Sequence, residues 1–160
     1  MARLKQSETT PNFFGIGIYN VSNEVNIGTL WRSAFVLGAS FIYTIGRKYE
    51  QQGSDVYQTW TQIPLYHYNS VEDLKSNLPY STRLIAIEIS PQAQDLCSFE
   101  HPDRAVYLLG SEMYGLPESV LELCHQQVVL PGNLSLNVAA TGSIVLYDRI
   151  SKIPTQLPKP

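Results

Sequence analysis

Three short stretches of this sequence combine charged or polar side chains with glycines at spacings that suit ligand binding. The first runs from Asn26 through Gly28 to Arg32 ("NIGTLWR") and places one arginine in a run typical of a buried helix. Asn26 is a favourable N-cap residue, and Arg32 reaches back over the turn that contains Gly28. Free amides at a helix start beside a guanidinium would bind a phosphate or another anion. The alternative, a surface ion pair of Arg32, stays open on this stretch alone.

The second stretch, "LLGSEMYGLP" (108–117), directly follows a predicted strand. Ligands of open α/β folds bind at the carboxyl edge of the sheet, where Gly110 and Glu112 would lie. Glu112 could accept hydrogen bonds from backbone amides or hold a neighbouring loop, and Gly115 permits a positive φ. A plain strand–turn–helix connection, with Pro117 in the first turn of the helix, explains the same residues.

The third stretch, "VVLPGNLSLNVAATGSIVLYDRI" (128–150), leads from a strand through a short polar loop into a long helix. Ser135 and Asn137 bracket the helix start, and capping is their commonest use. Small residues from 139 to 143 would let another backbone pack very near. The helical spacing predicts one buried face formed by Leu136, Ala140, Ile144 and Tyr147.

The elements that position these stretches alternate between strands and helices. Continuous apolar runs, partly β-branched, predict strands at 13–19, 40–46, 83–90, 104–110 and 126–131. Helical patterns lie at 26–38, 70–77, 91–97, 117–124 and 135–150. This alternation predicts an α/β fold, a mostly parallel sheet flanked by helices. The 160 residues indicate one domain, with a core of about 13–150 and a tail at either end.

The segment 47–68 fits neither pattern, because it is polar, aromatic-rich and irregular. A loop of this length is either a mobile functional lid or a misassigned element, and the lid is the favoured interpretation. Arg47 and Lys48 would lie at the carboxyl edge, the same edge as Arg32, and are basic residues that could bind an anion. The aromatic residues would either stack on planar groups of a ligand, or cover the sheet or build a dimer interface, and these last two roles are favoured for Trp60 and Tyr66.

The overall composition limits the classes of function. A net charge of −3 argues against a strongly basic nucleic-acid binder, although local basic patches remain possible. Cys97 and Cys124 have no metal-ligand spacing, so no metal site is expected. The sequence contains no run of 18 apolar residues, and it predicts a cytoplasmic protein without a membrane partner.

Taken together, the three stretches resemble the three motifs of the SpoU/TrmH family of RNA 2'-O-methyltransferases, within the SPOUT class. The resemblance covers roughly residues 13 to 150, and the chain is similar to the minimal, single-domain members. It implies that the C-terminal segment forms a deep trefoil knot and that S-adenosylmethionine binds in this knot. It also implies a homodimer with the active site across the interface. An RNA substrate is implied as well, with tRNA slightly preferred over rRNA.

The resemblance assigns roles residue by residue. Arg32 would lie closest to the reaction. It would either fix the adjacent RNA phosphate or act together with that phosphate, which accepts the proton or lowers the pKa of the guanidinium. Arg47 and Lys48 are candidates for RNA binding, and the aromatic residues of 47–68 could stack on unpaired bases. Ser135 and Asn137 would orient the ribose and the arginine, Glu112 would brace the loops, and Asn26 would help to fix Arg32. The implied cofactor-binding residues are Ile87, Glu88, Gly110, Glu112, Leu130, Ser135 and Leu136.

Two departures from the family's pattern concern the third stretch. Ala139 stands where relatives often carry a second serine, and the loop "PGNL" (131–134) is short. Both departures affect how tightly the cofactor and the RNA are expected to bind. A non-catalytic, dimeric RNA-binding module that retains the fold is the main alternative function. An α/β protein that binds another nucleotide is disfavoured, because neither a G-x-G-x-x-G after a strand nor a Walker loop is present.

Overall fold

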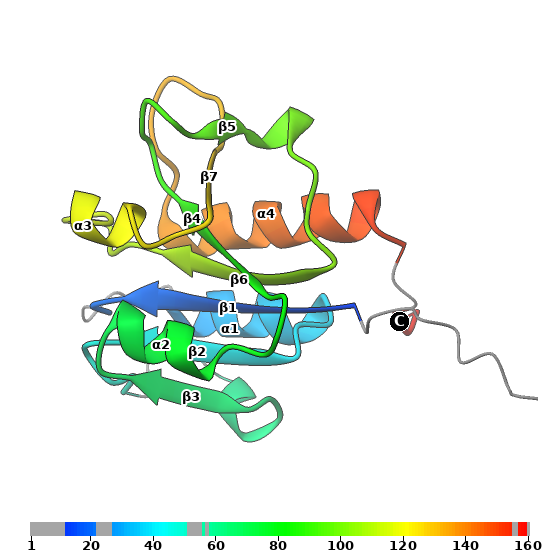
Figure 1. Cartoon of the computed structure of the whole chain (residues 1–160). Helices are drawn as coiled ribbons and strands as arrows, with labels where there is room; N and C mark the ends of the chain where they lie inside the picture. The colour runs from blue at the N-terminus through cyan, green and yellow to red at the C-terminus, as the bar shows by residue number, and fades with distance from the viewer. Residues whose placement is uncertain (1–11, 22–26, 51–55, 57, 155–156, 160) are drawn as a thin grey trace, which may run out of the picture.

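A computed structural model describes residues 12–21, 27–50, 56, 58–154 and 157–159. In the described chain, seven strands form one sheet in the order β3-β2-β1-β6-β4-β7-β5, and every pairing is parallel (Figure 1). The strands are β1 (Phe13–Tyr19), β2 (Phe41–Ile45), β3 (Leu65–Tyr68), β4 (Arg83–Ile87), β5 (Gln94–Asp95), β6 (Arg104–Leu109) and β7 (Gln126–Val129). The helices are α1 (Ile27–Val36), α2 (Val71–Asn77), α3 (Glu118–Leu121), α4 (Val138–Lys152) and the short 3-10 helices η1 (Thr59–Thr61) and η2 (Leu96–Ser98).

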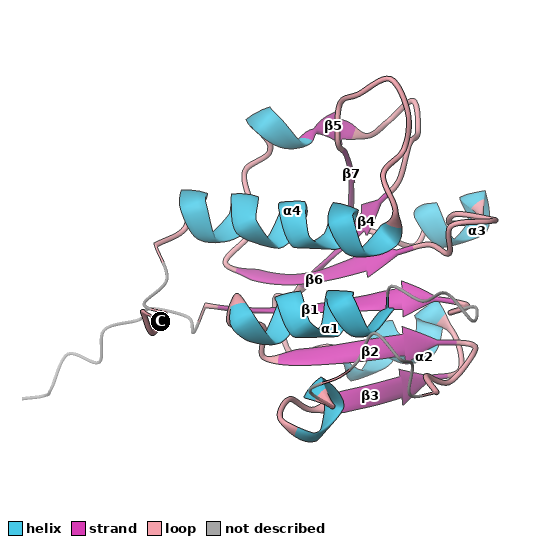
Figure 2. Ribbon diagram, turned by 180° about the vertical axis from the view of Figure 1, so that it is seen from behind, coloured by secondary structure: helices cyan, strands magenta, loops and turns pink. Residues whose placement is uncertain are grey.

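Helices cover both faces of this sheet, so the central strands are buried on both sides. The side chains of α1 and α4 pack in one apolar cluster, and those of α2 and α3 pack in the other. Figure 2 shows α1 and α4 side by side over the same face of the sheet. Because the strands have apolar neighbours above and below, their sequences are continuous apolar runs. The α/β prediction and its five strands are therefore confirmed. No helix in the described part of the chain is long and apolar enough to cross a membrane.

Two predicted segments have a different structure. The region 91–97 does not form a helix, because it contains β5 and the start of η2, whose first turn is capped by the Asp95 side chain on the amide of Cys97. The segment 47–68 ends in β3, an edge strand that the sequence did not reveal. The misassigned element is thus the correct alternative for 65–68. Residues 51–55 and 57 lie outside the described part.

The buried face of α4 also differs from the prediction. Leu136, Ile144 and Tyr147 are 51%, 43% and 64% exposed. The buried residues of the helix are Val138, Ala139, Gly142, Val145, Leu146 and Arg149. The inward face is the one with small residues, because α4 lies close to α1: a Cβ at Gly142 would lie 2.3 Å from Leu30 Cδ1. The helical spacing identified an apolar face, but this face points outward.

The connection 88–103, between β4 and β6, extends to the far side of β7. Its strand β5 pairs with one edge of β7, and β4 pairs with the other edge. The strand β7 is therefore inserted between two strands that precede it in the chain. Figure 1 shows the two long loops, 88–103 and 130–137, standing above the sheet at this end of the molecule.

Lys152, in the last turn of α4, binds the same connection. Its Nζ donates hydrogen bonds to the carbonyl oxygens of Leu96, Cys97 and Phe99, at 2.7, 3.2 and 3.1 Å. It also forms an ion pair of 2.8 Å with Asp148, one turn earlier. One side chain thus ties the end of the helix to three backbone positions of η2 and its flank.

His101 and Tyr107 continue this contact into the core. His101 Nε2 lies 2.7 Å from the Asp148 carboxylate, and Nδ1 lies 2.6 Å from the Tyr107 hydroxyl. The Tyr107 hydroxyl already accepts a hydrogen bond from Arg149, and burial raises the pKa of Tyr107 to about 12. It therefore stays protonated and donates to Nδ1, so that the Nε2–H donates to Asp148.

Arg149 is buried, with 1% of its surface exposed. Its guanidinium donates to the carbonyl oxygens of Pro102 and Asp103 and to the side-chain oxygen of Asn12, at 2.7, 2.8 and 2.6 Å. It also lies over the ring of Phe14, with 4.9 Å to the ring centroid. A buried arginine is tolerated because its donors are matched by acceptors in this way.

Candidate functional site

A cavity of about 560 Å³ opens at the carboxyl edge of the sheet, where β4, β6 and β7 end and α4 begins. All seven residues that the resemblance assigned to the cofactor line it: Ile87, Glu88, Gly110, Glu112, Leu130, Ser135 and Leu136. Asn137 lines it as well. Residues separated by fifty positions in the sequence thus surround one cavity, because parallel strands end at the same edge.

The turn 110–116 forms one wall, and its backbone conformation depends on two glycines. Gly115 has φ +61°, and its amide donates to the carbonyl oxygen of Ser111 at 2.8 Å. Gly110 faces this turn so closely that a Cβ would lie 2.2 Å from the carbonyl carbon of Gly115. The predicted positive φ at Gly115 is confirmed. Gly110, in turn, is required by backbone packing within the wall.

Glu88 fixes the same turn from the neighbouring strand. Its carboxylate accepts hydrogen bonds from the amides of Leu116 and Ile89, at 2.8 and 2.9 Å. A Cβ at Gly115 would lie 2.6 Å from Glu88 Oε2, so the carboxylate packs directly on the glycine. The sequence alone did not show this bracing contact, because it joins residues that are far apart in the chain.

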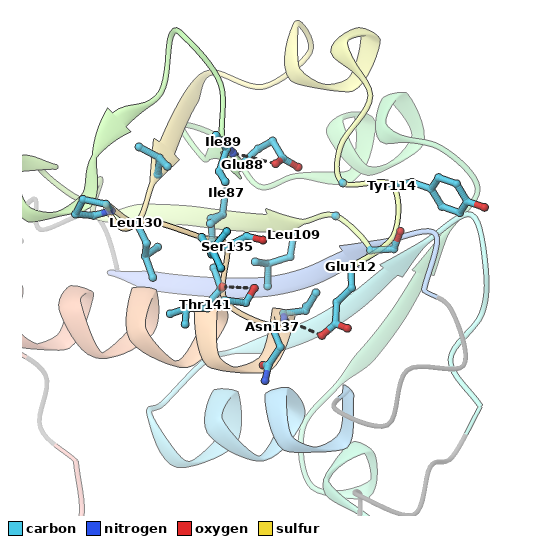
Figure 3. Close-up of a pocket in the computed structure, with 18 residues that line it drawn as sticks. Ile87, Glu88, Ile89, Leu109, Glu112, Tyr114, Leu130, Ser135, Asn137 and Thr141 are labelled. Carbon is cyan, nitrogen blue, oxygen red and sulfur yellow. Dashed lines mark hydrogen bonds between the residues drawn. The ribbon is translucent and has the colours of Figure 1, made fainter.

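Glu112 and Asn137 lie together at the start of α4. Glu112 Oε1 accepts a long hydrogen bond of 3.4 Å from the amide of Val138, and Figure 3 shows its side chain directed toward the helix start. Asn137 is the N-cap, and its Oδ1 accepts from the amide of Ala140 at 2.8 Å. Both groups satisfy free amides, and the carboxylate is favoured by the helix dipole. This contact matches the expectation that Glu112 holds a loop, and Asn137 has the capping role.

Several residues of the lining had not been singled out from the sequence. They are Ile89, Leu109, Tyr114, Leu134 and Thr141. Leu134 and Ile89 are 87% and 65% exposed, so they stand at the mouth of the cavity. The Thr141 hydroxyl donates to the carbonyl oxygen of Leu136 at 3.4 Å and ties the loop to α4. Leu134 and Ile89 are exposed apolar side chains in loops, which have no periodic pattern, and so no pattern in the sequence identified them.

Arg32 does not line this cavity. It lies on the exposed side of α1, as its position off the apolar face predicted. The hydroxyls of the next residue, Ser33, and of Ser143 are 2.7 Å apart, and this bond joins α1 to α4. Asn26 lies outside the described residues. The contact between α1 and α4 thus brings the helix that carries Arg32 against the helix that borders the cavity.

Arg47 and Lys48 are exposed directly after β2, at the same edge of the sheet as the cavity. Burial lowers the pKa of His67 on the adjacent strand, and the positive charge of Lys48 lowers it further. The two basic side chains thus make a locally positive site on a chain of net negative charge. Their predicted contact with RNA stays a prediction.

The aromatic residues that follow them mostly contact other rings. Tyr49 lies edge-on against Trp31, with 5.8 Å between the centroids. Tyr66 contacts Phe41 edge-on and lies tilted against Tyr68. Packing over the sheet and α1 is therefore their observed role, as favoured for Tyr66.

The fold and the motifs of this chain are shared with a known protein family. Residues 14–147 match the SpoU rRNA Methylase family. The chain belongs to this family. The match spans all three motifs, and it confirms the resemblance found in the sequence. S-adenosylmethionine is therefore the methyl donor expected for this chain.

The individual relatives have low sequence identity to this chain. The tRNA (guanosine(18)-2'-O)-methyltransferase TARBP1 of Mus musculus is 22% identical over 138 residues, which are 80% of this chain and 9% of that protein. The chain thus spans less than a tenth of this curated relative.

Two solved structures illustrate the similarity of fold. An AdoMet-bound rRNA methyltransferase from Sinorhizobium meliloti has a TM-score of 0.79 at 19% identity, covering 91% of this chain and 59% of that one. A protein from a structural study of the 2-OH methylation of C/U34 on tRNA has a TM-score of 0.76 at 22% identity, covering 90% of this chain and 98% of that one. At these identities, the similarity shows the fold.

Proposed function

We propose that this chain transfers a methyl group from S-adenosylmethionine to a ribose 2'-hydroxyl of RNA, with tRNA slightly preferred over rRNA. The observation that carries the proposal is the cavity at which the second and third motifs meet. The names of two similar proteins, which specify 2'-O or 2-OH methylation of tRNA, support the target group and the RNA class.

The residues of the cavity fit the cofactor. Its volume of about 560 Å³ lies within the range of about 300–1,000 Å³ that is usual for small-molecule sites. Ile87, Leu130 and Leu136 offer apolar surface for an adenine ring, while carboxylates of Glu88 and Glu112 suit a ligand that carries a positive sulfonium. We assign the cofactor to these residues together with Gly110 and Ser135.

The reaction needs a positioned hydroxyl more than a strong base. When bound, the cofactor would supply the methyl group, with the thioether S-adenosylhomocysteine as the leaving group. The guanidinium of Arg32 would hold the adjacent RNA phosphate, which fixes the hydroxyl in line and can take its proton. Ser135 and Asn137 would orient the ribose, Glu112 would hold the loop, and Asn26 would help to fix Arg32. Arg47 and Lys48 would bind further phosphates.

A homodimer would complete this site. Phe35 and Val36 of α1 are 44% and 59% exposed, and Ile144 and Tyr147 of α4 are 43% and 64% exposed. The two helices lie side by side (Figure 2), and we infer that these exposed apolar side chains pack against a second copy. Because Arg32 lies outside the cavity of its own chain, we propose that it serves the active site at this interface.

The dimer is tested by Tyr147→Glu, which places a charge in the centre of the surface. We expect light scattering to find a dimer for the unchanged protein and a folded monomer without methyl transfer for the variant. Tyr80→Glu, at another exposed tyrosine, is the control and should remain a dimer. A monomeric, active parent protein would contradict the proposed assembly.

The path of the chain supports the predicted deep trefoil knot. The strand β7 runs between β4 and β5, and α4 then binds the connection 88–103 from the other side. We propose that this connection encloses the C-terminal segment. We also propose a cytoplasmic location, because Cys97 and Cys124 are both unpaired in the structure.

The decisive test uses Arg32→Ala, with Arg83→Ala as the control at another exposed arginine. Methyl transfer from labelled cofactor to purified tRNA and rRNA fractions is measured, and the modified nucleosides are identified by mass spectrometry after digestion. We expect 2'-O-methyl nucleosides with the parent protein, at least a hundredfold loss in Arg32→Ala, and cofactor affinity within about twofold in calorimetry. A methylated base as the product, or loss of cofactor affinity in Arg32→Ala, would contradict the proposal.

A further inference from the structure

A second cavity, of about 520 Å³, adjoins the first one on the side of α3. The two cavities share Glu88, Ile89, Tyr114 and Gly115. The braced turn 110–116 is therefore a wall between two cavities. The transfer reaction proposed above uses only one of them.

Tyr114 stands at the tip of this wall and is 83% exposed. Figure 3 shows its ring directed away from Leu109 and Ser135, that is, away from the interior of the first cavity. The backbone below it is fixed by Gly115 N–Ser111 O and by the carboxylate of Glu88. An aromatic ring on a fixed turn offers a stacking surface that loses little conformational entropy on binding.

The second cavity carries hydrogen-bonding groups that suit the edge of a nucleobase. The Ser90 hydroxyl donates to the amide oxygen of Gln127, which leaves the amide nitrogen of Gln127 as a donor. Glu118 of α3 and Glu122, the residue after this helix, add carboxylate acceptors to the lining. Carboxylates repel phosphate but accept hydrogen bonds from the amino groups of adenine, cytosine and guanine.

We propose that Tyr114 and the second cavity bind an unpaired base of the RNA, beside the nucleotide whose ribose faces the first cavity. Tyr114 stacks on this base, and the polar lining favours bases that carry an amino group over uracil. This inference rests on the proposed function, because it takes RNA as the ligand that spans both cavities.

The test compares Tyr114→Ala, Tyr114→Phe and Gln127→Glu with the matched control Tyr80→Ala. Tyr80 is 89% exposed, but it lies between α2 and β4, at the amino edge of the sheet. The probes are short fluorescent single strands of adenosine, cytidine or uridine nucleotides, and binding is measured by anisotropy with saturating S-adenosylhomocysteine. Gln127→Glu keeps an acceptor for Ser90 but removes the amide donor.

We expect the parent protein to bind the adenosine and cytidine strands more tightly than the uridine strand. Tyr114→Ala should weaken this binding about 5- to 100-fold, as for other base–aromatic stacks, whereas Tyr114→Phe should keep it within about twofold. Gln127→Glu should weaken binding several-fold and change the order of the bases. Tyr80→Ala and the cofactor affinity of all variants should remain unchanged.

Other outcomes overturn the inference. The inference fails if the parent protein binds none of the strands. It also fails if Tyr114→Ala and Tyr80→Ala weaken binding equally, or if Tyr114→Ala loses affinity for the cofactor and not for RNA. Methyl transfer to RNA fractions is measured in parallel. If the parent protein methylates RNA and Tyr114→Ala has the same KM, the inference fails alone. If strands bind through Tyr114 but no RNA is methylated, the proposed function fails and the base site stands.

Discussion

The two ends of α4 differ in almost every physical respect. At its N-terminal end, all residues from 131 to 137 are exposed, and the carboxylate of Glu112 lies 3.4 Å from the amide that it holds. At its C-terminal end, Arg149 is 1% exposed, and its guanidinium makes hydrogen bonds of 2.6 to 2.8 Å to three oxygens. One end of the helix borders a cavity, and the other is anchored in the protein.

This difference shows how one helix combines rigidity with a ligand site. A ligand site needs exposed groups and open volume, and these contribute little to stability. The anchored end supplies buried, fully matched polar groups, whose removal is expensive. Because the helix is rigid, fixing Arg149 also fixes the position of Asn137, about three turns away.

The largest effect on stability is expected from a substitution at the anchored, C-terminal end of α4. Arg149→Ala leaves the oxygens of Pro102, Asp103 and Asn12 without their donor. We expect the free energy of unfolding to fall by about 3–5 kcal/mol, as for other buried charged groups that lose their partners. Urea denaturation measures this change. The exposed Arg83→Ala should change stability by less than about 0.5 kcal/mol. A similar small effect in Arg149→Ala would mean that the two ends do not differ in energy.

At the N-terminal end of α4, which borders the cavity, we expect a smaller effect on stability but a large effect on cofactor binding. A Cβ in Gly110→Ala would meet the Gly115 carbonyl carbon at 2.2 Å, so the turn must open. We expect a loss of about 1–3 kcal/mol in stability and more than tenfold in cofactor affinity. Calorimetry with S-adenosylmethionine checks the second figure. Gly132→Ala, where the nearest atom is 3.7 Å away, is the control in the same cavity region. Unchanged affinity in Gly110→Ala would exclude this turn from the cofactor site.

The smallest effect concerns pH and the anchored end. Burial lowers the pKa of His101 below its ordinary value of 6.5, although its hydrogen bond to Asp148 acts in the opposite direction. Below about pH 6.5, the unfolded chain therefore binds a proton that the folded chain does not, and stability is lost as the pH falls. We expect His101→Gln to flatten the decrease of the melting temperature between pH 7.5 and 5.

The control for this prediction is His125→Gln. Burial also lowers the pKa of His125, but this ring is exposed and should contribute less to the slope. An equal slope for the parent protein and His101→Gln would show that His101 does not titrate between the folded and unfolded states in this range.

The sequence was sufficient for the layers of the fold and for part of the cavity lining. Continuous apolar runs identified five strands, because buried strands have no polar face to interrupt them. The strand end at 108–117 made Gly110, Glu112 and Gly115 candidates, and the combination of this stretch with the two others separated a ligand site from a plain turn. Motif order then added Ile87 and Leu130, which no local pattern would have selected.

Other features depend on contacts that have no local signature. The strands β3 and β5 are short and lie at the edges of the sheet, so they lack the apolar runs of the interior. The outward face of α4 carries Ile144 and Tyr147, which made it resemble the core. The contact of Glu88 with Leu116 and the contacts of Arg149 gave no signal, since the partners lie 28 and more than 40 positions away in the chain.

The insertion of β7 between two earlier strands also bears on how the protein is made. During synthesis, β1, β2, β3, β4 and β6 all leave the ribosome before β7, whereas β5 pairs only with β7 in the described chain. The cavity gains its last wall only when residues 130–138 have emerged. A nascent chain that stops earlier contains most of the sheet and no complete ligand site. Binding of the cofactor would thus report that synthesis of this region is finished.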